Sequence, residues 1–349
     1  MRFIIIASAV VLIFPPKVIL GFETGEAADQ AVIDSLIRIS INESIEHNYA
    51  CAESAAEEMI KIAPKSPAGY FYRAGVVNSM MLDYEDNFRE DDFYNYLDRT
   101  IELSEKMIRA DADNPWGHFY LGGASGYLAL HHTCNGRFFS ALGHGLKAVK
   151  ELDKTMQLDS TLYDAYLGIG NYKYWLSRRT EFLRWLPFIK DRREEGIKMI
   201  YTAMERGEFS RDTAASSLAW VLIDAGRYQH AYKTAEEALK RHPDSRFFLF
   251  ASGRSLFELG RYEEAIVVYE KLLSSIRSLE RNNHFNEISV LDKLAEAYYL
   301  KGNYQMCFEY AKAGLALPLD AEMRKTKAVP LKRMETLKAK SLDRLMLEQ

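Results

Sequence analysis

The chain has 349 residues, a formal net charge of −4 at pH 7 and 48% hydrophobic residues. This apolar content is ample for burial, and the slightly acidic balance gives no support for nucleic acid as a partner. A globular chain of this length would usually form about two domains, but an array of repeats escapes that limit because each repeat adds its own share of core. No segment of any length alternates with the strand period, so the sequence predicts an all-α protein.

The first residues of the chain have the pattern of a secretory signal. Arg2 precedes an apolar run, IIIASAVVLIF, which is followed by Pro15 and Pro16. The run is shorter than the roughly 20 apolar residues that span a membrane. We therefore predict a signal peptide over residues 1–27, cleaved after Gly21 or Ala27, with an uncleaved interfacial anchor as the alternative. Export would place the mature chain in the periplasm or elsewhere in the cell envelope.

Residues 28–211 are predicted to form helical hairpins that depart from a regular repeat. Ala52, Ala56 and Pro64 suit the second helix of a first hairpin, which begins near Ile33. Small residues let paired helices approach closely, and proline ends a helix because it lacks an N–H group. Further hairpins are expected to begin near Ala68, Trp116 and Leu162.

In these later hairpins the second helix begins later than a regular repeat allows. The extra residues are Asp83–Asp92, His131–Arg137 and Ser177–Asp191. All three insertions are predicted to lie at the turn inside a hairpin, and therefore along one edge of the stack. The first, DYEDNFREDD, does not have the spacing of an EF-hand calcium loop, so we interpret it as a solvated, charged turn.

The second insertion contains a group of soft metal ligands. His131, His132 and Cys134 lie together, and imidazole and thiolate suit zinc or copper. However, the chain has no CxxC, CxxCH or HExxH spacing, and adjacent histidines rarely face one ion. We therefore favour loop and helix-cap roles for these residues and predict no cofactor, with a metal or small-ligand carrier as the alternative.

The third insertion mixes aromatic and basic side chains over Trp175–Gly196. Its candidate contact residues are Trp185, Phe188, Arg184 and Arg192. Three interpretations stay open. The aromatic rings could fold back and fill a gap between repeats, they could contact a protein, or they could lie at a membrane interface with the arginines reaching the headgroups.

Residues 212–320 contain one pattern three times: an apolar helix, a turn with glycine and an aromatic residue, and an Ala-rich helix. The turn glycines are Gly226, Gly260 and Gly302. Each is followed two residues later by a tyrosine and five residues later by a small residue, namely Tyr228, Tyr262 and Tyr304, then Ala231, Ala265 and Cys307. Glycine permits the positive φ that often ends a helix, and the small residue permits close helix packing. These units are helical hairpins that must stack to bury their apolar faces.

Residues 321–349 are predicted to form a terminal helix. Its apolar residues have helical spacing: Leu331, Met334, Leu337, Leu342 and Leu345. Basic residues are in excess on the remaining positions. A polar outer face is what the end of a repeat array needs for solubility, so capping is the favoured role.

The repeated pattern resembles the tetratricopeptide repeat family, whose period is about 34 residues. The resemblance is strong over Asp212–Pro318 and weaker upstream. It implies a right-handed superhelical solenoid of about seven helical hairpins with a C-terminal capping helix.

The resemblance also implies a peptide-binding groove lined by the first helix of each hairpin. The matching positions in this sequence are Tyr172, Lys173, Trp220, Phe250, Arg254, Phe257, Glu258, Glu296 and Tyr299. The family's carboxylate clamp for peptide tails uses Lys, Asn and Arg at such positions. Here Lys173 and Arg254 stand alone among acids, so that specificity does not carry over.

The three cysteines do not form a disulfide framework in this interpretation. Cys51, Cys134 and Cys307 belong to different repeats, and an odd count leaves at least one thiol free. Cys51 and Cys307 lie on Ala-rich helices, where we expect them to be core residues.

No catalytic pattern is present: the sequence lacks GxSxG, a phosphate-binding glycine loop and a zincin motif. We therefore predict an exported, non-enzymatic scaffold that holds a protein or peptide partner in a cell-envelope assembly. The alternatives are a peripheral membrane protein that docks through Trp185–Phe188, and a metal or small-ligand carrier at His131, His132 and Cys134.

Overall fold

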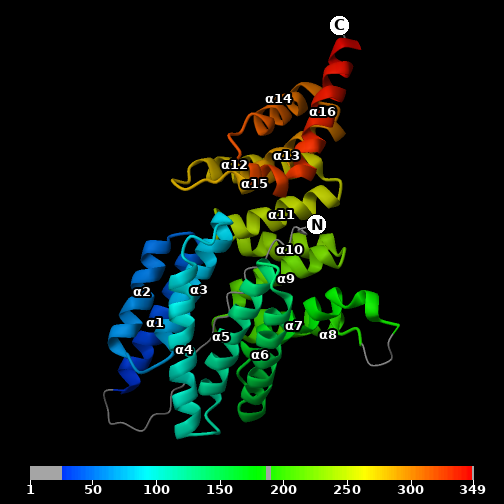
Figure 1. Cartoon of the computed structure of the whole chain (residues 1–349). Coiled ribbons are helices and arrows are strands. Elements are labelled where there is room, and N and C mark those ends of the chain that lie inside the picture. The colour runs from blue at the N-terminus through cyan, green and yellow to red at the C-terminus, as the bar shows by residue number, and fades with distance from the viewer. Residues whose placement is uncertain (1–25, 186–189, 348–349) are drawn as a thin grey trace. The chain divides into compact units, whose positions relative to one another are not determined.

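The computed structural model describes residues 26–185 and 190–347. Most of the predicted signal peptide and the candidate contact residue Phe188 lie outside these ranges. Within them, every regular element is helical (Figure 1). None of the described helices combines the length and the apolar content needed to cross a bilayer.

Fourteen of the described helices follow one another as seven hairpins, which confirms the predicted number. The hairpins are α1 (Glu26–Ile45) with α2 (Tyr49–Ile62), α3 (Ala68–Tyr84) with α4 (Glu90–Ala110), α5 (Pro115–Cys134) with α6 (Phe138–Leu158), α7 (Ala165–Arg179) with α8 (Arg193–Arg206), α9 (Arg211–Asp224) with α10 (Tyr228–Leu239), α11 (Arg246–Glu258) with α12 (Tyr262–Arg277), and α13 (Phe285–Leu300) with α14 (Tyr304–Leu315). The short helix α15 (Ala321–Thr326) and the final helix α16 (Ala328–Leu347) follow them.

The described chain divides into two compact units, which we treat separately. Unit 1 contains Asp83–Asp86 and residues 222–347, and unit 2 contains residues 26–82, 87–185 and 190–221.

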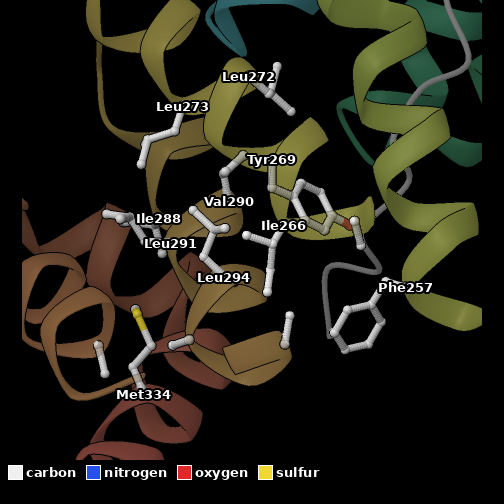
Figure 2. Packing of buried hydrophobic residues seen from close by; sticks show 14 of the residues in the cluster. Phe257, Ile266, Tyr269, Leu272, Leu273, Ile288, Val290, Leu291, Leu294 and Met334 are labelled. Carbon is white, nitrogen blue, oxygen red and sulfur yellow. The ribbon is translucent and has the colours of Figure 1, made fainter. Parts of the chain in front are cut away.

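The core of unit 1 is formed by aliphatic side chains from α11 to α14 and from α16. Figure 2 shows Ile266, Tyr269, Leu291 and Leu294 packed together, with Met334 of α16 against them. Each of these side chains contributes about 1.5–3 kcal/mol by leaving water. Helix α16 packs on α13 and α14, so the terminal helix caps the last hairpin as predicted.

Unit 2 has a core rich in aromatic rings. Phe71 lies against Tyr120 and Tyr127, with ring centroids 5.5 and 5.3 Å apart. A Cβ atom on Gly123 would lie 2.8 Å from the Phe71 ring, so this glycine allows the ring to pack against the backbone of α5. Edge-on and tilted ring pairs of this kind add about 0.5–1.5 kcal/mol beyond area burial.

The turn glycines adopt the conformation that the sequence pattern predicts. Gly226, Gly260 and Gly302 have φ angles of 71°, 73° and 77°, in the left-handed region. Gly136 has the same conformation, with a φ angle of 70°. It is followed by Phe138 and by the buried Ala141 at the same spacing, so the turn between α5 and α6 is a fourth example that sequence analysis missed.

Two of the three predicted insertions are helical over about half of their length. Helix α5 continues through His131–Cys134, and the connection to α6 is only Asn135–Arg137. Helices α3 and α4 likewise extend to Tyr84 and from Glu90. Both insertions lie at the turn inside a hairpin as predicted, but the turns are shorter than expected because the flanking helices continue into them, up to the positive-φ residues Glu85 and Gly136.

The acidic stretch after Leu82 is not a uniformly solvated turn, contrary to expectation. The Asp83 carboxylate is buried inside unit 1, where Arg246 Nε donates a hydrogen bond of 2.7 Å to it. Asn286 donates to the Asp83 backbone carbonyl at 2.9 Å. A buried carboxylate needs a charged partner, and here the Arg246 guanidinium supplies it through both carboxylate oxygens.

The cysteine predictions were half correct. Cys307 is buried, as expected, and burial raises the pKa of its thiol. Cys51 is exposed, so its assignment to the core is wrong. Helix α2 buries Ala52, Ala55, Ala56 and Met59, and Cys51 points away from that face.

Candidate partner-binding surface

The first helices of the last two hairpins place charged and aromatic side chains on one surface of unit 1. On α11 these are Phe250, Arg254, Phe257 and Glu258, whose spacing of four, three and one keeps them on one side of the helix. Helix α13 adds Asp292, Lys293, Glu296 and Tyr299, and α16 adds Arg333. We call these nine residues the α11–α13 surface, although Phe257 and Asp292 are themselves buried and support the other seven.

Ion pairs link the charged residues of the α11–α13 surface. Arg254 Nη2 lies 2.7 Å from Glu258 Oε1, and Lys293 Nζ lies 2.7 Å from Glu296 Oε2. Arg333 Nη1 lies 3.4 Å from Glu296 Oε2, and Arg333 Nε donates to Asp292 at 2.8 Å. Both signs of charge therefore alternate across the surface in short, ordered contacts.

On this surface, the charged side chains of α13 are more deeply buried than those of α11. It lowers the pKa of Lys293, and it raises the pKa of Asp292 although Arg333 opposes that effect. The hydrogen bond to Asp292 raises the pKa of Arg333. These groups have already lost part of their hydration, so further covering by a partner costs less than it would for free side chains.

Aromatic rings border the same surface. Lys293 Nζ lies 4.1 Å from the centre of the Phe257 ring. Phe257 also meets Tyr262 edge to face at 5.5 Å, and Tyr299 meets Tyr304 in the same way at 5.5 Å. In two of the three turns, the tyrosine that follows the glycine therefore supports an aromatic residue of the preceding helix, whereas the residue equivalent to Phe257 before Tyr228 is Ile223.

The structure does not bring all of the predicted groove residues together. Tyr172, Lys173 and Trp220 belong to unit 2, whereas the others belong to unit 1. Lys173 lies 2.6 Å from Glu195 and is largely covered. Trp220 is buried, so it offers little surface to a partner. The role of the predicted set in binding stays a prediction.

Lys293 and Arg333 were missed by sequence analysis. Lys293 of α13 contacts Phe257 of α11, and no spacing within one helix predicts a contact between two helices. Arg333 was counted only as one of the basic residues of a terminal helix. Which residue of α16 faces α13 depends on packing that no local pattern encodes.

The histidine group of α5 is used in packing and hydrogen bonding. His131 is buried, with Nε2 2.8 Å from Glu90 Oε1, and its ring lies 5.2 Å from that of Phe93. The rings of His132 and His144 are 5.2 Å apart, and burial lowers the pKa of both. Cys134 is exposed. Among the described residues no three His, Cys, Asp or Glu side chains are arranged to hold a metal ion.

The connection between α7 and α8 exposes its aromatic residues where the structure describes them. Phe182 and Trp185 are exposed, so for these two rings the interpretation that they fill a gap between repeats is wrong. Arg184 pairs with Asp191 at 2.5 Å, and Arg192 pairs with Glu195 at 2.7 Å. The predicted contact residues Arg184 and Arg192 are therefore held by acids of the same segment.

Two family models match the C-terminal half of the chain. The model described as anaphase-promoting complex, cyclosome, subunit 3, matches residues 204–272, and a tetratricopeptide repeat model matches residues 249–318. No curated protein matches.

Solved structures of helical-repeat proteins resemble the chain at low sequence identity. YrrB, described as a TPR protein with an unusual peptide-binding site, is 16% identical, covers 65% of this chain and 98% of its own, and has a TM-score of 0.46. PilW, a type IV pilus biogenesis factor, is 14% identical over 72% of this chain and 97% of its own, with a TM-score of 0.47. The Cut9–Hcn1 structure is 14% identical over 97% of this chain and 65% of its own, with a TM-score of 0.44.

Sequence identities and TM-scores this low carry no information about shared partners. The repeated Gly-x-Tyr turns, the seven helical hairpins and the matching repeat models agree with one another. The chain contains tetratricopeptide repeats in its C-terminal half, where the family model matches residues 249–318.

Proposed function

We propose that the protein is an exported, non-enzymatic scaffold that holds a segment of a protein partner on the α11–α13 surface, within an assembly of the cell envelope. The repeat fold is that of protein-interaction scaffolds, which bind peptides or proteins. Export rests on the apolar run after Arg2 in the sequence.

The observation that carries the proposal is the state of the charges on the α11–α13 surface. Arg254, Glu258 and Glu296 are held in place by ion pairs, yet each keeps part of its side chain in solvent. Such side chains are pre-organised, so they lose little further conformational entropy when a partner binds. The half-buried rings of Phe250 and Tyr299 supply apolar contact area. Charges of both signs beside aromatic rings suit a peptide that carries acidic, basic and apolar side chains.

The test is affinity capture of the full chain from crosslinked envelope fractions, comparing the parent with Arg254→Glu. The variant places a carboxylate beside Glu258 and should repel the acidic part of the partner. We expect capture to fall at least about tenfold, which corresponds to about 1.4 kcal/mol.

Arg261→Glu is the matched control. The Arg261 side chain is 34% exposed and pairs with a glutamate of its own helix, as does Arg254, which is 38% exposed. Arg261 lies at the start of α12, outside the α11–α13 surface. Melting temperatures of the three proteins establish that folding is equal. Equal capture by the parent and by Arg254→Glu would reject this surface, and absence of the chain from envelope fractions would reject export.

A further inference from the structure

Helix α6 carries large apolar side chains on its solvent-facing side. Phe139, Leu142 and Leu146 follow one another at three and four residues, so they form one stripe along the helix, and Phe138 adjoins it. All four are exposed, and Phe139 is 94% exposed. The opposite side of α6 buries Ala141, Gly145, Ala148 and Leu152 in the core of unit 2. The stripe is therefore not needed to hold the hairpin together.

The regular repeats of the same chain have polar residues at two of the four corresponding positions, those of Phe139 and Leu146, and aromatic or aliphatic residues at the other two. Counting from the turn glycine, Phe139 of α6 corresponds to Gln229, Glu263 and Gln305. Leu146 corresponds to Glu236, Glu270 and Lys312. Three equivalent helices thus carry polar side chains where α6 has a phenylalanine and a leucine, and those at the Phe139 position are exposed. Exposed apolar residues that gather in this way mark a contact surface.

The segment after α7 adds two exposed rings of the same unit to this apolar stripe. The Arg179 guanidinium lies 5.7 Å from the centre of the Phe138 ring, so the end of α7 reaches the start of α6. Phe182 and Trp185 follow within the next six residues and are 75% and 77% exposed. We call these six residues the α6 patch: Phe138, Phe139, Leu142, Leu146, Phe182 and Trp185.

Basic residues outnumber acidic ones in the two segments that carry the α6 patch. Residues 137–150 and 178–195 contain nine Lys and Arg and four Asp and Glu, in a chain whose net charge is −4. The acids of the second segment, such as Glu181 and Asp191, are already paired with arginines. Arg179 makes no ion pair with any described carboxylate. The α6 patch is thus a locally basic, aromatic-rich area on an acidic protein.

We propose that the α6 patch docks on the surface of an anionic lipid bilayer. Rings and aliphatic side chains would enter the interface, and the flanking arginines and lysines would meet the headgroups. The side chains project from a helix and a loop, and no pocket holds them. A bilayer accepts projections of any shape, whereas a protein partner needs a matching hollow for a side chain as exposed as Phe139. The inference uses a different surface from the α11–α13 surface and does not depend on it.

The test is quenching of tryptophan fluorescence by vesicles of brominated phosphatidylcholine with phosphatidylglycerol, using the full chain. Trp116 and Trp220 are buried and Trp175 is half-buried, so Trp185 is the tryptophan that the bromines can reach. This readout reports contact at the patch even if the N-terminal apolar run holds the chain on the vesicle. We expect the vesicles to quench the parent and to have almost no effect on Trp185→Phe.

The double variant Phe139→Glu/Leu146→Glu should raise the lipid concentration needed for half-maximal quenching at least about tenfold. Val267→Glu is the matched control, because Val267 is 68% exposed on α12 and lies outside the patch. It should behave like the parent. Higher salt should weaken the parent's binding, since the Debye length shortens.

Three results would overturn the proposal. The first is absence of quenching in the parent. The second is equal quenching of the parent and the double variant, with equal melting temperatures. The third is self-association of the parent in solution that the double variant abolishes, because the patch would then join two copies of the chain. Equal binding to vesicles of phosphatidylcholine alone would overturn the requirement for anionic lipid.

Discussion

At Gly260 the backbone turns with a φ angle of 73°, between a helix that ends and one that begins. A Cβ atom added there would meet no other atom within 4 Å. The role of this glycine is therefore conformational, because an L-residue with a side chain is strained at positive φ even in open space.

Gly260→Ala is expected to lower the free energy of unfolding by about 1 kcal/mol. Gly143 offers a matched control, since a Cβ atom there also meets nothing within 4 Å but the residue lies inside α6 at negative φ. Gly143→Ala should raise stability by about 0.5–1 kcal/mol, because alanine is the better helix former. Urea unfolding of both variants measures the difference. Equal effects at the two sites would show that the turn conformation is not what Gly260 provides.

At the scale of single helices, α16 is attached through one apolar face, in which Met334 is the most deeply buried apolar side chain. Met334 is completely buried against α13 and α14. A Cβ atom on Gly314 would lie only 2.5 Å from the Met334 sulfur, so this glycine makes room for the side chain. Met346 lies near the end of the same helix and is 64% exposed. The two methionines separate the contribution of packing from that of helix propensity.

Met334→Ala is expected to cost about 2–5 kcal/mol, the usual range for a buried large-to-small change that leaves a cavity. Met346→Ala should change stability by less than about 0.5 kcal/mol. Thermal unfolding followed by circular dichroism tests both. A small effect of Met334→Ala would mean that α16 is held mainly by Arg333 and its ion pairs.

Sequence patterns predicted the hairpins but not their lengths. The repeat is legible because Gly226, Gly260 and Gly302 each need a conformation that only glycine adopts easily. The end of α5 was predicted too early because His131–Cys134 lack glycine and proline, and such residues continue a helix when its neighbours allow. The glycine that ends this hairpin, Gly136, has the same signature, which the longer helices obscured.

The candidate surfaces were predictable to different degrees. Repeat register placed Arg254, Phe257 and Glu258 on one face of α11, because spacing along a single helix fixes that relation. The pairing of Arg333 with Asp292 joins two helices, and no local pattern specifies which residues of α16 meet α13. The outward direction of Phe139 was hidden for the same reason, since an apolar residue near a helix start is most simply assigned to the core.

For the molecule as a whole, charge is unevenly distributed, and the two compact units let the distribution of stability be tested. The net charge is negative, yet basic residues outnumber acidic ones in the two segments that carry the α6 patch. Repeat arrays are stabilised mainly by contacts between neighbouring hairpins, so a local defect should remain local unless the array unfolds as one body. Because the chain has two compact units, a defect can be placed in each unit and its effect measured in the other.

Two cavity variants, one in each unit, make the comparison. Met334→Ala removes contacts among α13, α14 and α16, and Leu152→Ala removes a buried side chain that packs on Gly122 between α5 and α6. Amide hydrogen exchange should become about 30-fold faster or more in the helices around each substitution, since about 2 kcal/mol or more of local stability is lost. The helices of the other unit should keep the parent's rates. If Met334→Ala accelerated exchange equally in α5 and α6, the units would unfold together and coupling would extend beyond neighbouring hairpins.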